Sequence, residues 1–134
     1  MQQYHHIETI TTSQPISVIE LDDDINNVIR HSRMTEGFVI ISSLHTTTAI
    51  TVNEHEEKLL QFIKKLLERL SSGSQDNAQR HMLAMLLGSS ETIPIANRKM
   101  QLGENQSVML LDLDGPKKRS VNIHVLGEVS QRWQ

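Results

Sequence analysis

The chain has 134 residues, a formal net charge of −3, only 37% hydrophobic and 3% aromatic residues, and no cysteine. This length predicts a single domain over residues 1–134 with an aliphatic core. The absence of cysteine excludes disulfides and thiolate metal ligands, and without a long basic run there is no signal for nucleic-acid binding. No apolar run approaches the ~18 residues of a membrane span, and no signal pattern is seen, so we expect a cytoplasmic protein.

The first quarter of the chain predicts two strands and a helix. Residues 2–12 and 16–21 are β-like, and the turn residues 13–15 between them suggest a hairpin at a sheet edge. Asp22 is expected to be the N-cap of a helix with an acidic first turn. Gly37 is the expected stop of this helix.

An apolar strand and an unusually polar strand follow. Phe38 to Leu44 is nearly continuously apolar, which predicts a central strand covered on both faces. The next stretch, LHTTTAITVNE, is β-like but rich in threonine. His45 enters this strand and Glu54 leaves it, so two groups able to bind metal or move protons bracket it.

Two helices come next. Residues 56–70 carry an apolar stripe at helical spacing and form the clearest helix. Asp76 or Asn77 can cap a third helix that runs through Leu87. That helix is apolar nearly all round, so we expect it to be well buried.

Four β-like runs complete the chain, at residues 92–96, 100–102, 108–113 and 120–128. The order is therefore β-β-α-β-β-α-α-β-β-β-β. Runs of strands interrupted by helices favour an α+β fold over a doubly wound one.

Two clusters could carry chemistry. His45 and His81 lie in polar-flanked junctions, where each is either a ligand or acid–base group or a hydrogen-bonded structural residue. Zinc requires three or four ligands, and two histidines do not complete a site. The second cluster, LDLDGPKKR, is first of all a turn sequence, but Lys117 and Arg119 within it could hold a phosphate.

Taken together, these motifs resemble the signature of the YjbQ family, over roughly residues 40–125. The motifs are HTT-A…NE at residues 45–54, N-A-x-x-H…LLGSS at 77–90, G-x-x-Q at 103–106 and D-G-P-x-x-R at 114–119. The resemblance implies an α+β domain with about three helices, whose mixed, mostly antiparallel sheet folds into a sandwich. It also implies that the chain assembles as a homotrimer.

The resemblance further implies a site near the subunit interface that holds a divalent metal, most often zinc, or an anion. Family members are often labelled secondary thiamine-phosphate synthase, a transferase acting on phosphorylated small molecules. Carried over by position, the candidates are His45, Asn53, Glu54 and His81 for catalysis, His45 and His81 for metal, and Lys117 and Arg119 for phosphate.

The chain departs from the family pattern at the site. The Tyr-x-His element expected shortly before Asn77 is replaced by SSGSQD, so a third histidine ligand is missing, and His55 is the available substitute. Asn105 replaces a tryptophan, and Lys117 replaces an arginine.

Three hypotheses follow from these sequence features. The chain is a thiamine-phosphate synthase-type enzyme, a non-catalytic trimer that binds a metal or small anion, or a protein whose histidines are structural. We favour the second, because a ligand is missing.

Overall fold

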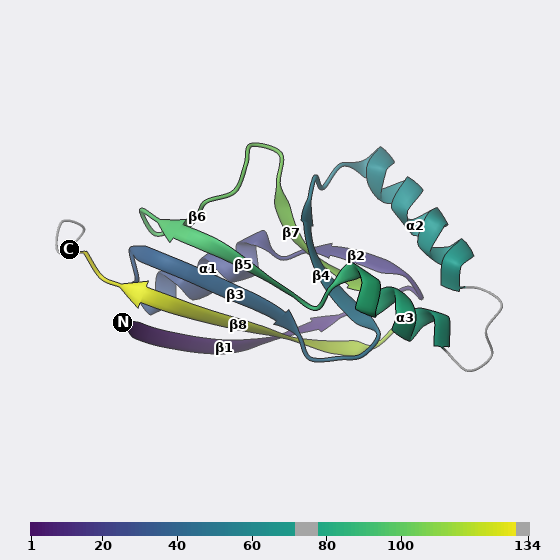
Figure 1. The fold of residues 1–134 in the computed structure, drawn as a ribbon, viewed down its shortest axis with the longest axis horizontal. Coiled ribbons are helices and arrows are strands. Elements are labelled where there is room, and N and C mark those ends of the chain that lie inside the picture. The colour runs from purple at the N-terminus through teal and green to yellow at the C-terminus, as the bar shows by residue number, and fades with distance from the viewer. Residues whose placement is uncertain (72–77, 131–134) are drawn as a thin grey trace.

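A computed structural model describes residues 1–71 and 78–130 of the chain. Its elements are β1 (Gln2–Thr11), β2 (Ser17–Glu20), α1 (Asp22–Ser32), β3 (Glu36–Ser43), β4 (Thr48–Asn53), α2 (Glu57–Ser71), α3 (Ala78–Leu87), β5 (Ser90–Ala96), β6 (Lys99–Met100), β7 (Ser107–Asp112) and β8 (Lys118–Glu128) (Figure 1). This is the order of strands and helices that the sequence predicts. Asp76 and Asn77, the predicted caps of α3, lie outside the described residues.

Two antiparallel sheets build the domain. The larger has the order β1-β8-β3-β5-β6, and the smaller has the order β2-β7-β4. Every strand pair in the described part of the chain is antiparallel. With three helices, this arrangement confirms the predicted α+β class.

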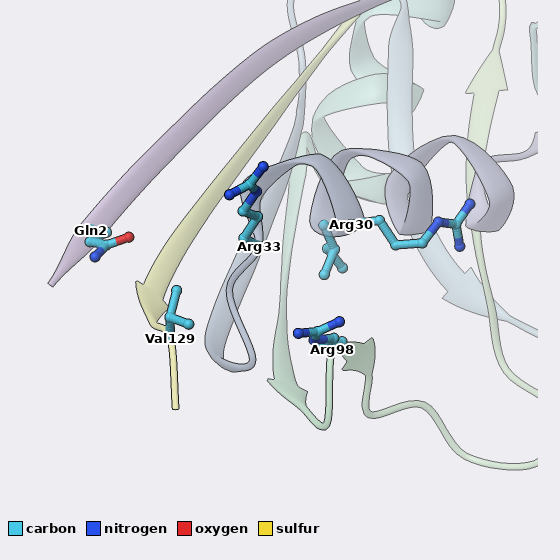
Figure 2. A pocket seen from close by; sticks show the side chains of 6 residues that line it. Gln2, Arg30, Arg33, Arg98 and Val129 are labelled. Atoms are coloured by element: carbon cyan, nitrogen blue, oxygen red, sulfur yellow. The ribbon is translucent and has the colours of Figure 1, made fainter. Parts of the chain in front are cut away.

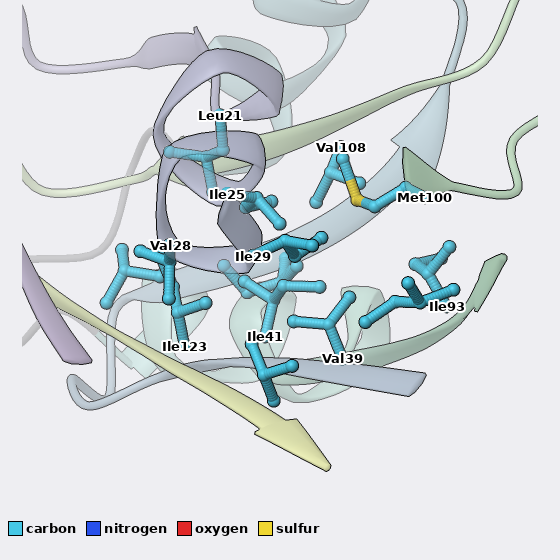
Figure 3. Close-up of a cluster of buried hydrophobic side chains, with 14 of the residues drawn as sticks. Leu21, Ile25, Val28, Ile29, Val39, Ile41, Ile93, Met100, Val108 and Ile123 are labelled. Atoms are coloured by element: carbon cyan, nitrogen blue, oxygen red, sulfur yellow. The ribbon is translucent and has the colours of Figure 1, made fainter. Parts of the chain in front are cut away.

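The main core lies where α1 packs against the strands. Figure 3 shows Ile25 and Ile29 of α1 facing Val39 and Ile41 of β3. These four side chains are fully buried. Burying an aliphatic side chain of this size stabilises the fold by roughly 1.5–3 kcal/mol, so α1 is a principal stabilising element.

The predicted hairpin of the first two strands is wrong. β1 pairs with β8, and β2 pairs with β7, so the two strands lie at the edges of different sheets. The segment between them is held by the β7–β8 loop instead, since the Thr12 N–H donates to the Lys117 carbonyl and the Gly115 N–H donates to the Pro15 carbonyl. Turn residues predict where the chain changes direction, but they do not predict which strands pair with each other.

The predicted ends of α1 are also corrected. Leu21 is the N-cap, and Asp22 instead accepts a hydrogen bond from the Val108 N–H through Oδ1 at 2.8 Å, which ties the helix to β7. The helix ends at Arg33, whose φ of 64° is left-handed. Gly37 lies within β3, where a Cβ would come 2.1 Å from the Leu126 carbonyl oxygen.

Two predictions of burial are wrong. Only one face of β3 is fully covered, because Phe38 and Ile40 on the other face are partly exposed. In α3, Leu83 and Ala84 are buried, but Met85 is 82% and Leu86 80% exposed. Figure 1 shows the reason, since α2 and α3 lie at one end of the sheets and the rest of the chain covers only one side of each helix.

A buried ion pair joins the two sheets. Asp112 at the end of β7 is fully buried, and Arg119 in β8 is 4% exposed. Arg119 donates from Nη2 to Oδ1 at 2.7 Å and from Nε to Oδ2 at 3.0 Å. The carboxylate also accepts from the Thr12 hydroxyl at 2.7 Å and the Asp114 N–H at 2.9 Å, and Nη2 reaches the Thr47 hydroxyl at 3.0 Å. Buried charges need such complete pairing to be tolerated.

None of the helices in the described part of the chain is long and apolar enough to cross a membrane.

Removing one partner of the Asp112–Arg119 pair is expected to destabilise the protein strongly. Asp112→Ala leaves a buried, unpaired guanidinium, which costs about 3–5 kcal/mol. Urea denaturation measures this loss, with Glu104→Ala in an exposed loop as the control, expected within about 0.5 kcal/mol of wild type. A loss below 1 kcal/mol for Asp112→Ala would contradict a structural role for the pair.

The Asp112–Arg119 pair also makes the stability of the protein depend on pH. Burial alone raises the pKa of Asp112, but hydrogen bonds from Arg119, Thr12 and the Asp114 N–H, with the charge of Arg119, hold this pKa below its ordinary value. A depressed folded pKa gives stability that is present above the unfolded pKa and lost as pH falls through the folded one. The free energy of unfolding should therefore fall from about pH 5 to about pH 3, with a smaller slope in Asp112→Asn. Equal slopes would contradict this prediction.

Candidate functional site

A cavity of about 550 Å³ brings the two candidate histidines together. It lies between α3 and the turn that leads into β4. Its lining consists of His45, Thr46, Thr48, His81, Ala84, Met85, Gly88 and Ser89. His45 and His81, which are 36 residues apart in the sequence, therefore border one cavity, as the prediction of a shared site requires.

The turn before β4 fixes the backbone of His45. The Ser43 hydroxyl donates to the His45 carbonyl at 3.1 Å and accepts from the His45 N–H at 3.2 Å. The Thr48 hydroxyl contacts the same Ser43 hydroxyl and lies 3.5 Å from the His45 carbonyl. Short hydroxyl side chains that bond nearby backbone groups favour turns over regular strands, which explains why the polar stretch bends here.

The imidazole of His45 is held in one form. The Ser120 N–H donates to its Nε2 at 2.9 Å, so this nitrogen carries no proton, and in the neutral ring the proton lies on Nδ1. Burial lowers the pKa of His45, and the charges of Arg119 and Lys117 lower it further, against the opposing charge of Asp112. His45 is therefore neutral near pH 7, with a single N–H to donate.

Packing of α3 positions His81. Leu83 and Ala84 are buried in a small cluster with Leu67 and Leu113. Nearby, Arg80 Nη1 lies 3.1 Å from Asp114 Oδ1. Leu83 and Arg80 face the rest of the protein. The exposed His81 and Met85, four positions apart on the helix, therefore lie on the side that borders the cavity.

Gly88 and Ser89 close the end of the cavity next to the strands. Gly88 ends α3 with a φ of 97°, a conformation that favours glycine. Its carbonyl accepts from the Ile50 N–H at 3.1 Å, and the Ser89 carbonyl accepts from the Ser43 N–H at 2.8 Å. These bonds attach the end of α3 to β3 and β4, so the cavity wall is part of the fold.

Asn53, Glu54 and His55 do not border the cavity. Asn53 is the last residue of β4, and Glu54 and His55 follow it. This strand has six residues at ~3.3 Å each, so the three side chains lie at its other end from His45. Asn53 Oδ1 accepts from the Glu54 N–H at 2.7 Å, and His55 Nδ1 lies 3.3 Å from Glu20 Oε2. One chain therefore does not bring Asn53 and Glu54 to the histidine pair.

The two side chains predicted to bind phosphate, Lys117 and Arg119, are paired with carboxylates outside the cavity. Lys117 Nζ lies 2.7 Å from Asp114 Oδ2 and borders no part of the cavity. Arg119 is buried against Asp112. Their effect on the cavity comes through the pKa of His45, which both charges lower.

The side chains present do not fit a zinc site within one chain. Among residues 1–71 and 78–130, no group of three His, Cys, Asp or Glu side chains could hold a metal ion. Nε2 of His45 is occupied by the Ser120 N–H, and His55, the expected substitute ligand, lies against Glu20. The zinc prediction has no support from these residues.

Sequence reasoning missed Ser120. Its contribution is a backbone N–H, which every residue except proline carries, so no sequence signal marks it. Its proximity to His45 depends on how the start of β8 crosses the turn before β4, which only the fold reveals.

Known proteins match the chain over nearly its full length. The UPF0047 protein of Methanothermobacter thermautotrophicus is 32% identical over 96% of this chain and 95% of its own length. The UPF0047 protein of Archaeoglobus fulgidus is 32% identical over 88% of this chain and 98% of its own length.

Solved structures match equally fully. A YbjQ-like protein of unknown function from Sulfolobus solfataricus is 28% identical, with a TM-score of 0.89 over 95% of this chain and 99% of its own. A YjbQ/UPF0047 family protein from Clostridium acetobutylicum is 26% identical, with a TM-score of 0.85 over 90% of this chain and 99% of its own. The family described as UPF0047 protein YjbQ-like matches residues 6–128, and the chain belongs to this YjbQ family.

Proposed function

We propose that the cavity between His45 and His81 binds a small anionic ligand, such as a phosphorylated small molecule, without a zinc ion. The observation that carries this proposal is the hydrogen bond from the Ser120 N–H to Nε2 of His45. It leaves the Nδ1–H as the donor of a neutral ring, which suits an anion's oxygen and does not suit a metal.

The rest of the lining supports an anion. Thr46 and Ser89 add hydroxyl donors, and among the described residues no carboxylate borders the cavity. His81 adds a second imidazole to the lining. Ala84 and Met85 supply apolar surface for the organic part of a ligand.

A thiamine-phosphate synthase-type transferase reaction remains a prediction of the resemblance. Such a reaction needs groups that position two phosphorylated substrates and stabilise a leaving pyrophosphate. Asn53, Glu54, Lys117 and Arg119 were expected to supply them, but these residues do not border the cavity of one chain. A binding role is the function that this geometry favours.

We also propose that the chain forms the homotrimer that the resemblance implies. Apolar side chains are exposed along α2 and α3: Phe62, Leu66, Leu70, Met82, Met85 and Leu86. Large exposed apolar patches mark interaction sites in proteins that are not monomers. A second copy is the proposed occupant, and because Met85 also lines the cavity, that copy would border the bound ligand.

Binding at the cavity is tested with inorganic pyrophosphate. Wild type should gain about 2.7 kcal/mol of stability at a ligand concentration 100 times the dissociation constant. His45→Ala and His81→Ala should each reduce affinity at least tenfold, whereas His55→Ala, outside the cavity, should bind as wild type does. Calorimetry at pH 7 measures all four proteins, each carrying Arg33→Gly and Arg98→Gly so that the separate arginine-lined cavity described below does not contribute. Equal affinities in all four would contradict the assignment of this cavity.

Self-association is tested by light scattering after size-exclusion chromatography. Wild type should elute at about three times the 15.3 kDa mass of one chain. Met85→Glu with Leu86→Glu places charges in the proposed interface and should give single chains, while Gln61→Glu on α2 should leave the mass unchanged. A wild-type mass of one chain at every concentration would refute the trimer.

A further inference from the structure

A second, arginine-lined cavity lies far from the histidines. It has a volume of about 700 Å³ and is lined by Gln2, Ile29, Arg30, Arg33, Arg98 and Val129. Figure 2 shows Arg98 across the cavity from Arg30 of α1 and from Arg33, which follows that helix; the side chains of Arg30 and Arg33 extend away from Arg98. The cavity is near the start of β3, whereas His45 follows the end of that strand, so the two cavities are separate sites.

A smaller cavity extends the first one. It has a volume of about 420 Å³, and it shares Arg30 and Arg98 with the larger cavity. Lys99 and Asn26 are among its additional lining residues. We call the two cavities together the arginine groove.

Two of the arginines occupy backbone positions that favour glycine. Arg33 ends α1 with a φ of 64°, where a C-terminal glycine is usual. Asn97 and Arg98, with φ values of 54° and 66°, form the two-residue turn between β5 and β6, where Asn-Gly is the favoured sequence. Strained backbone positions cluster at functional sites, and here two of them, from distant parts of the sequence, border one groove.

The wall of the groove is preformed around Thr35, which is fully buried. The Thr35 carbonyl accepts from the Arg98 N–H at 3.2 Å. The Thr35 N–H donates to the Glu128 carbonyl at 3.0 Å, and its hydroxyl accepts from the Ser130 N–H at 2.7 Å. Thr35 therefore holds the end of α1, the β5–β6 turn and the end of β8 in fixed relation, so binding needs little backbone reorganisation.

The charge in the groove opposes the charge of the whole chain. The chain carries a formal net charge of −3, but four cations line the groove, namely Arg30, Arg33, Arg98 and Lys99. Among the described residues, Asp22 is the only acidic side chain in the lining, and its Oδ1 already accepts from the Val108 N–H. The planar guanidinium group matches the geometry of phosphate oxygens, so this lining favours a phosphate over a neutral ligand.

One buried polar atom without a partner among the described residues indicates that the ligand carries an organic part as well as a phosphate. Asn26 borders the smaller cavity, and its buried Oδ1 has no hydrogen-bond partner within the described residues. A buried acceptor without a partner is costly, and a hydroxyl or amine of a ligand would satisfy it. Met100 and Leu102 offer apolar surface beside it.

We propose that the arginine groove binds a small phosphate ester. Arg33 and Arg98 hold its phosphate, and its organic part contacts Asn26 and the apolar lining. This proposal is independent of the ligand proposed for the histidine cavity, because the two cavities share no residue.

The test uses the full chain with His45→Ala and His81→Ala, so that the histidine cavity does not contribute. Calorimetry measures binding of inorganic pyrophosphate before and after Arg33→Gly and Arg98→Gly are added. We expect affinity to fall at least tenfold, while the melting temperature stays within a few degrees of the parent or rises, because glycine relieves both positive φ angles. Lys58→Gln with Lys65→Gln removes the same charge from α2 and should leave affinity unchanged.

The outcomes decide the proposal. Failure of the parent to bind pyrophosphate, or equal affinity after the arginine substitutions, would overturn it. If the glycine variant fails to fold, Arg33→Asn with Arg98→Asn serves, because asparagine also tolerates a left-handed backbone. Adenosine diphosphate is the second probe, and binding tighter than pyrophosphate identifies an ester, whereas equal binding shows that the phosphates alone are recognised.

Discussion

The ion pair between Asp112 and Arg119 is the interaction on which both the fold and the histidine cavity depend. It joins β7 of the small sheet to β8 of the large one, and with Thr12 and Thr47 it fixes the segments that lead from one sheet to the other. Such a pair is tolerated in the interior because both carboxylate oxygens and the guanidinium Nε and Nη2 have partners. It also brings the start of β8, and with it the Ser120 N–H, against His45.

The position of the pair decides what His45 can do. Burial lowers the pKa of His45, the guanidinium charge of Arg119 lowers it further against the opposing charge of Asp112, and the Ser120 N–H assigns the ring proton to Nδ1. A buried arginine therefore acts on the cavity without touching a ligand. Lys117 and Arg119 of the turn sequence LDLDGPKKR therefore influence His45 by their charge, although neither side chain lines the cavity.

The sequence predicted much of the fold but little of the site's chemistry. Apolar patterns with turn and capping residues predicted the order of strands and helices, and the polar-flanked junctions with the family resemblance selected His45 and His81, which border one cavity. Strand partners, the exposure of α3 and the engagement of Arg119 were not predictable, because they depend on contacts between distant segments. The same holds for the arginine groove, since Arg33 and Arg98 looked like ordinary residues at a helix end and a turn.

The protonation state of His45 tests the account most directly. Nitrogen-15 chemical shifts of its ring, recorded by NMR across a pH titration of the full chain, report the charge and the tautomer separately. The account predicts a neutral ring at pH 7 with the proton on Nδ1, an unprotonated Nε2, and a pKa below the ordinary histidine value. A proton on Nε2 in the neutral ring, or a positively charged ring at pH 7, would contradict it and remove the basis for a metal-free anion site.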